Sequence, residues 1–166
     1  MGMNGVQQFI IGQLAGLTSE YYAPAVASLQ VLIPDKITSN APHFYVMSSS
    51  GSEVRRTAPF PDAYKELTHQ VEVYVVMIQP NRIKNASGVF VQDRAFPSLM
   101  DAMMAKLRSI DPDTIITDPD TGVTSSLLNV GEDMKWRYAI PEDRGNQIRM
   151  LWQGLITMTI KEWIVG

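Results

Sequence analysis

The last stretch of the chain constrains the fold most, because its side chains alternate between apolar and polar. Apolar residues occupy every second position from 148 to 152 and again from 156 to 160. A period of two is typical of a β-strand with one buried face. After residue 160 the pattern changes, since Glu162 falls on the apolar face and Trp163 on the polar one. The strand end is therefore expected either to cross a bulge or to present large side chains outside the domain.

The composition is that of one globular domain with a core of its own. The chain has 166 residues, of which 45% are hydrophobic and 19% charged. A net charge of -3 is too weak and of the wrong sign for a phosphate-neutralising surface, which argues against direct nucleic-acid recognition. Cysteine is absent, which excludes disulfides, thiolate metal sites and cysteine nucleophiles. Stability is expected to come from packing or from partners.

The nearly uncharged N-terminus does not read as a targeting segment. A signal peptide begins with basic residues, whereas the first lysine is Lys36 and polar residues interrupt the stretch before it. Residues 21–34 are apolar over too short a span to cross a membrane, and they include Pro24. We therefore expect a cytosolic product with no membrane anchor.

Three helices are predicted from spacing and from residues that begin or end helices. Apolar residues three and four apart predict an amphipathic helix over 6–21. Pro24 is suited to start a second helical segment that runs through Leu32. In the third, Ser98 is the expected cap, an apolar stripe covers 99–110, and the following Asp-Pro pair ends the helix.

The strands are expected at 44–47, 71–78, 134–140 and 147–165. The stretch 48–66, rich in Ser, Gly and Pro, is too long for a tight hairpin and predicts a protruding loop. The expected fold is α+β, a mostly antiparallel sheet of about four strands with helices packed on one face. The whole chain, 1–166, is taken as a single domain, with an N-terminal helical segment (1–33) before a sheet-and-helix core (42–166).

Catalytic and metal-binding patterns are weak. The segment DPDTIITDPDTG makes Asp113, Asp118 and Asp120 candidates for a divalent ion, but its spacing does not match an EF-hand loop, and aspartate before proline favours turns. His43 and His69 lie on separate segments, and no nucleophile elbow, phosphate-binding loop or dinucleotide fingerprint is present. We expect neither a resident metal or cofactor nor catalysis.

A set of residues near the predicted loop, the hairpin turn and the chain end is expected to contact a second subunit or a partner. The arginines are either solvated or paired with acidic residues of a neighbour. Trp163 is either a core residue or an interface anchor, because a large aromatic side chain on the polar face of a strand is typical of binding hot spots. The set is Arg55, Arg56, Arg144, Glu162, Trp163 and Val165.

The order of these elements, with HFYVM, LTHQVEVYVVM, FPSLMDAMMAKLRSI, MKWRYA and LITMTIKEWI, resembles the tail terminator proteins of long-tailed bacteriophages, of the lambda minor tail protein U type. The resemblance runs from about Pro42 to the end. It implies an α+β fold and a hexameric ring that sits on the last ring of the major tail-tube protein and offers its other face to the head–tail connector protein. It also implies a location in the virion tail, after assembly in the host cytoplasm, and no catalysis.

Two alternatives stay open. One is another tail-tube or head–tail connector protein with the same order of elements, and the other is a small hydrolase or binding domain that uses the acidic loop with a divalent ion. The closing strand favours assembly, because 19 residues extend about 60 Å whereas a compact chain of this length is about 40 Å across. The strand is expected to bend at Gly154 or to protrude, with its tip facing a neighbouring subunit.

Overall fold

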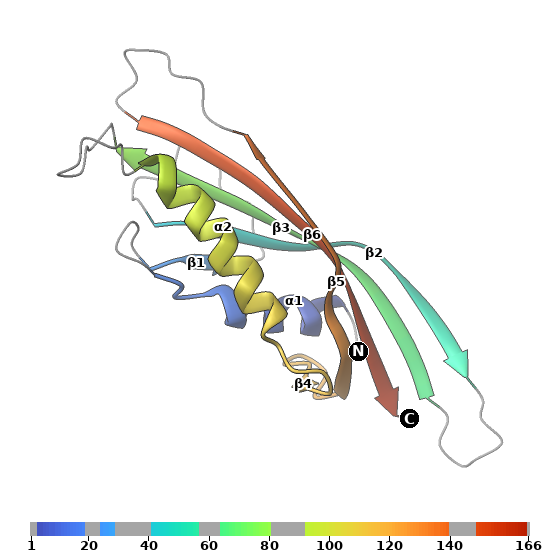
Figure 1. Cartoon of the computed structure of the whole chain (residues 1–166). Coiled ribbons are helices and arrows are strands. Elements are labelled where there is room, and N and C mark those ends of the chain that lie inside the picture. The colour runs from blue at the N-terminus through green and yellow to red at the C-terminus, as the bar shows by residue number, and fades with distance from the viewer. Residues whose placement is uncertain are drawn as a thin grey trace.

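The computed structural model describes residues 3–18, 24–28, 41–56, 64–80, 92–139 and 149–165. Within these ranges, six strands form one sheet in the order β1-β2-β3-β6-β5-β4, and two helices accompany it (Figure 1). The β1–β2 pair is parallel and the other pairs are antiparallel. The elements are α1 (Met3–Leu14), β1 (Val26–Ser28), β2 (His43–Arg56), β3 (Tyr64–Pro80), α2 (Gln92–Arg108), β4 (Ile115–Thr117), β5 (Thr124–Ala139) and β6 (Arg149–Val165).

The closing strand β6 lies in the middle of the sheet. Its 17 residues pair with β3 along their whole length, from Pro80 opposite Arg149 to Tyr64 opposite Val165. On its other side β6 pairs with β5. The long strands turn about one another, so the sheet is strongly curled (Figure 1). The predicted terminal strand is thus confirmed, and its length is accommodated by the curl of the sheet.

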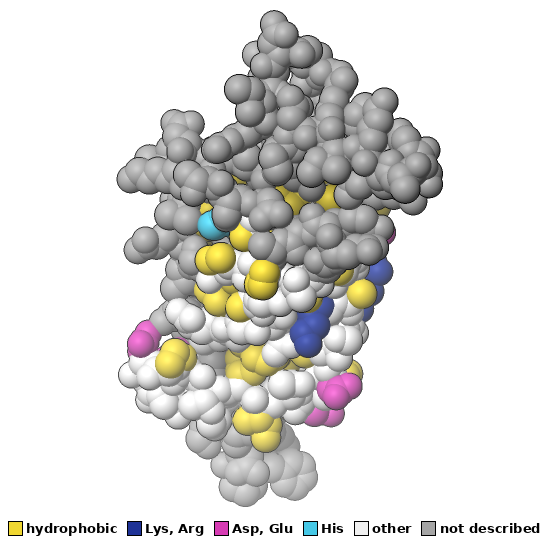
Figure 2. All heavy atoms as spheres, turned by 90° about the vertical axis from the view of Figure 1, so that its left-hand side faces the viewer, with side chains coloured by type: hydrophobic (Ala, Val, Ile, Leu, Met, Phe, Trp, Pro, Cys, Tyr) yellow, Lys and Arg dark blue, Asp and Glu magenta, His cyan; other side chains and the backbone are white. Residues whose placement is uncertain are grey.

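The core fills the face of the sheet on which the helices lie. Phe96 of α2 is fully buried and stacks on Trp152 of β6, with ring centroids 5.3 Å apart. A Cβ atom at Gly154 would lie 3.0 Å from the sulfur of Met100 and 3.1 Å from the ring of Phe96. Gly154 therefore gives α2 room to approach the sheet, which is a packing role beyond the expected bend. In Figure 2, which looks onto the left-hand side of Figure 1, the visible hydrophobic side chains form small separate groups.

The expected α+β fold with a sheet of about four strands is wrong. The protein is mostly β, with one strongly curled mixed sheet and two helices. Two strands were missed because each has only three residues, too few to show a period: β4 (Ile115–Thr117) lies inside the acidic segment 111–122, and β1 lies at Val26–Ser28. The second helical segment, expected from Pro24 to Leu32 within the N-terminal segment 1–33, is likewise wrong where the structure describes it.

The expected loop over 48–66 is wrong at 48–56 and 64–66, whereas residues 57–63 lie outside the described part of the chain. Ser48–Arg56 completes β2, and β3 begins at Tyr64, so the two strands form one long hairpin. Serine and glycine are poor strand formers, but the backbone hydrogen bonds to β3, which is held on its other edge by β6, outweigh that preference. Helix boundaries differ as well, since α1 ends at Leu14 and α2 begins at Gln92, with Pro97 inside it.

Candidate functional site

The end of β6 keeps its alternation and presents Trp163 outward. The β3–β6 register runs without a shift, and the irregularities lie in the β5–β6 pairing instead. Glu162 is 0% exposed on the face that carries the core, whereas Trp163, on the opposite face, is 37% exposed. Of the two outcomes expected for this strand end, the structure therefore has the second, a large side chain directed away from the core.

Trp163 belongs to a row of side chains that crosses four strands. The register places Glu66 (β3), Trp163 (β6), Ser126 (β5) and Ile115 (β4) next to one another. Ile115 is 73% exposed, and the small Ser126 beside it leaves a hollow of about 210 Å³ between the two apolar side chains. We call these four residues the tip row. Two large apolar side chains at the rim of one hollow are typical of an interaction surface.

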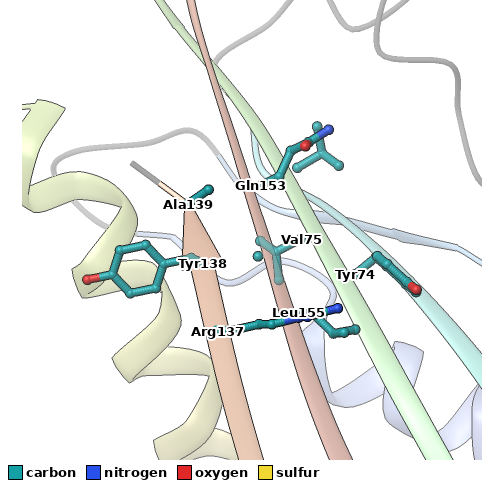
Figure 3. A pocket seen from close by; sticks show the side chains of 9 residues that line it. Tyr74, Val75, Arg137, Tyr138, Ala139, Gln153 and Leu155 are labelled. Carbon is teal, nitrogen blue, oxygen red and sulfur yellow. The ribbon is translucent and has the colours of Figure 1, made fainter. Parts of the chain in front are cut away.

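A second row lies on the same outer face, eight residues from the tip row along β6. Arg137 (β5), Leu155 (β6) and Tyr74 (β3) are neighbours in the register, and we call them the base row. Figure 3 shows all three directed away from α2, whereas Tyr138 points toward that helix. With Gln153 they line a hollow of about 440 Å³, within the range of volumes that accept ligands. The base row could not be found from the sequence. Tyr74 and Leu155, for example, are 81 residues apart, and only the register of the strands brings them side by side.

Glu162 is held inside the sheet by two hydrogen bonds. Its Oε1 lies 3.1 Å from Nε2 of His69, and its Oε2 accepts a hydrogen bond from the Ser125 hydroxyl at 2.9 Å. All three side chains are buried, and they come from β3, β6 and β5. A carboxylate is costly to bury unless it is hydrogen-bonded. Glu162, expected at a partner interface, is therefore a core group that joins three strands.

This polar group does not have the geometry of a hydrolytic triad. The Ser125 hydroxyl donates to the carboxylate and not to the imidazole, so the histidine is not placed to take the serine proton. The β2 backbone also covers the ring, since a Cβ at Gly51 would lie 3.7 Å from Nδ1 of His69. That Nδ1 atom is buried and has no hydrogen-bond partner within the described residues. The arrangement fits a structural role at the centre of the hairpin.

Arg55 is engaged within its own hairpin. Its Nε donates to the carboxylate of Glu53, and Nζ of Lys65 lies 3.9 Å from the same oxygen. The hydrogen bond from Arg55 holds the pKa of Glu53 below its usual value, and the same bond raises the pKa of Arg55. Arg56 and Val165 end β2 and β6, and their side chains, like the whole of Arg144, lie outside the described residues.

The acidic segment forms a turn on each side of β4. Oδ1 of the buried Asp118 accepts hydrogen bonds from the backbone N–H groups of Asp120, at 2.9 Å, and Thr121, at 3.1 Å. Asp113 adopts a left-handed φ of 65°, a conformation that aspartate tolerates in turns. In the ranges that the structure describes, no group of three or more His, Cys, Asp or Glu side chains is placed to hold a metal ion.

The fold and these surfaces define a curled β-sheet protein with two exposed hollows on its outer face. No protein-family model matches the chain, and a search of curated proteins gave no significant match. Of the two described helices, neither is long and apolar enough to cross a membrane.

Proposed function

We propose that this protein is a structural component that assembles into a ring and acts as a tail terminator of a long-tailed bacteriophage. In that role it caps the tail tube, stops its polymerisation and provides the surface for head joining. The observation that carries the proposal is the tip row, where Ile115, 73% exposed, and Trp163, 37% exposed, face each other across the hollow above Ser126. Two large apolar side chains at the rim of one hollow are suited to contact a second subunit.

The sequence resemblance supplies the specific part of the proposal. It concerns the segments from Pro42 to the end, which include β3, α2, β5 and β6. The partners proposed on this basis are further copies of the chain in a hexameric ring, the major tail-tube protein and the head–tail connector protein. The ring works without a cofactor, membrane attachment or direct recognition of nucleic acid, and its place is the virion tail.

The size and shape of the assemblies that the purified protein forms test the proposal directly. Light scattering and negative-stain microscopy of the purified protein, alone and mixed with tail tubes, are expected to show closed rings and caps at tube ends. Added protein is also expected to stop further growth of tubes from their subunits. A protein that stays monomeric in both settings contradicts the proposal, and rings that extend tubes instead of ending them identify a tail-tube protein.

Enzymatic function is tested separately. The protein is expected to show no hydrolytic turnover with or without a divalent ion. Activity that is lost on replacing Asp113 and Asp118 with asparagine would establish the alternative of a metal-dependent enzyme.

A further inference from the structure

On the basis of the proposed ring, we propose that the tip row of one subunit packs onto the base row of the next, so that Trp163 enters the hollow beside Leu155 and Glu66 pairs with Arg137. The contact is heterologous, which means that each subunit gives its tip to one neighbour and receives a tip from another.

The two rows cannot meet within one subunit. Leu155 and Trp163 lie on the same strand and the same face, eight residues apart. At about 3.3 Å per residue the separation along β6 is about 26 Å. Tyr74 and Glu66 are separated by the same number of residues on β3. Any contact between the rows therefore joins two copies of the chain.

The chemistry of the two rows is complementary. The base row offers a guanidinium, an aliphatic side chain and an exposed tyrosine, and the tip row offers an indole, an isoleucine and a carboxylate. A guanidinium stacks favourably on an indole face and binds a carboxylate in a planar, two-point geometry. The hollow of about 440 Å³ leaves space for one aromatic side chain of the partner. Both rows consist of residues on the outer face, so the contact needs no change in the core.

The order of the strands decides how the two copies are oriented. Consider two copies of the sheet that face each other with their β6 strands running in the same direction. Seen from one side, the strand order of one copy is the reverse of the other, so β3 of one copy lies over β5 of the other. Glu66 (β3) of one copy then meets Arg137 (β5) of its neighbour. If the β6 strands run in opposite directions, β3 lies over β3, and Glu66 meets Tyr74 instead. The opposite charges of Glu66 and Arg137 select the first arrangement, which is head-to-tail.

A head-to-tail contact gives a closed ring when the rotation between neighbours closes and an open filament when it does not. The strands turn markedly between the base and the tip (Figure 1). The two outer surfaces therefore face different directions, and each added subunit is rotated with respect to the one before. The ring of the proposed function is the closed form of this contact.

Engineered cysteines test the arrangement, because the natural chain has none. The double variant E66C/R137C is expected to form intermolecular disulfides on mild oxidation and to give a ladder of linked subunits on a denaturing gel. Disulfides need Cα atoms within about 7 Å, so the pair cannot close within one subunit. The matched control is E66C/Y74C, which links in the opposed arrangement and is expected to stay unlinked. Linking of the control in place of the first pair would overturn the proposal.

Charge reversal provides a second test that does not depend on oxidation. E66R and R137E are each expected to weaken self-association about tenfold or more, and the double variant E66R/R137E is expected to restore it. K135E is the control, since Lys135 is exposed on the same strand and face but lies outside the base row. Thermal melts must show that all four variants fold. Weakening by both single reversals without restoration in the double variant would contradict the pairing.

The tests separate this contact from the proposed function. Rings whose subunits are not linked through E66C/R137C leave the ring standing and overturn the contact. Linked head-to-tail chains that form open filaments uphold the contact and contradict the ring. A monomeric protein without links contradicts both.

Discussion

The two ends of the sheet are built from the same three strands, β3, β6 and β5, yet they are stabilised differently. At the base, large side chains of α2 pack on the sheet, with Phe96 stacked on Trp152 and the helix drawn close at Gly154. At the tip, the inner face carries the buried hydrogen bonds of Glu162 and, beyond them, the ion pair of Glu53 and Arg55. Apolar side chains such as Leu127 are buried at the tip as well, but only there does a buried carboxylate join three strands by directed hydrogen bonds. Changes at the tip should affect assembly more than folding.

The largest effect on folding is expected at the base. Replacing Phe96 with alanine removes a fully buried ring that contacts both Trp152 and Tyr138. The free energy of unfolding should fall by about 3–5 kcal/mol, measured by urea denaturation. Tyr74→Ala on the outer face is the control and should cost far less. A loss below about 1 kcal/mol for Phe96→Ala would show that the helix is not a main source of stability.

Replacing Glu162, the buried carboxylate, is expected to lower the free energy of unfolding by a smaller amount. Glu162→Ala leaves the Ser125 hydroxyl and Nε2 of His69 buried without their acceptor, which should cost about 1–3 kcal/mol of unfolding free energy. Glu162→Gln keeps an oxygen for one partner and should be less destabilising. If alanine is tolerated as well as glutamine, the tip is not held by these hydrogen bonds.

Trp163→Ala should separate assembly from folding. Because the side chain is 37% exposed, the loss in unfolding free energy should be smaller than the loss of about 3–5 kcal/mol expected for Phe96→Ala. Self-association should weaken about 30-fold or more, as expected for a hot spot worth about 2 kcal/mol. Calorimetry and sedimentation measure the two effects. A steep fall in melting temperature with unchanged association would place Trp163 in the core of its own subunit.

The smallest effect is a dependence on pH at the end of the hairpin. The pKa of Glu53 is lowered in the folded protein by the hydrogen bond from Arg55, so the folded state holds this proton less tightly than the unfolded state does. The contribution of the pair is present above the unfolded pKa of the carboxyl and is lost as the pH falls through the folded value. Arg55→Ala should make the stability of the protein depend less on pH in the acidic range. Thermal melts of the variant and of the natural protein at several acidic pH values measure this difference. An unchanged slope would mean that the exposed pair is fully screened by solvent.

Segments with a long alternating pattern were predictable from the sequence. Strands that are short, or rich in serine and glycine, were not. Alternation identified β6 and the second half of β5, an apolar run identified part of β3, and the apolar stripe identified most of α2. Ser48–Arg56 was missed because its serines and glycine resemble a loop, and only pairing with β3 makes it a strand. An outward Trp163 was one of two outcomes that the sequence left open. The partners of Glu162 were not predictable, because His69 lies 93 residues away and is brought near by the register alone.

The central place of β6 also bears on how the chain folds. It is the last of the six described strands in sequence order, yet it is the strand that joins β1-β2-β3 to β4-β5. During synthesis these two sets of strands are made first. The edges of β3 and β5 stay unpaired until β6 is made and inserts between them. Contacts between distant segments slow folding, so substitutions in the middle of β6 are expected to slow the folding rate, whereas those in α1 should act mainly on unfolding.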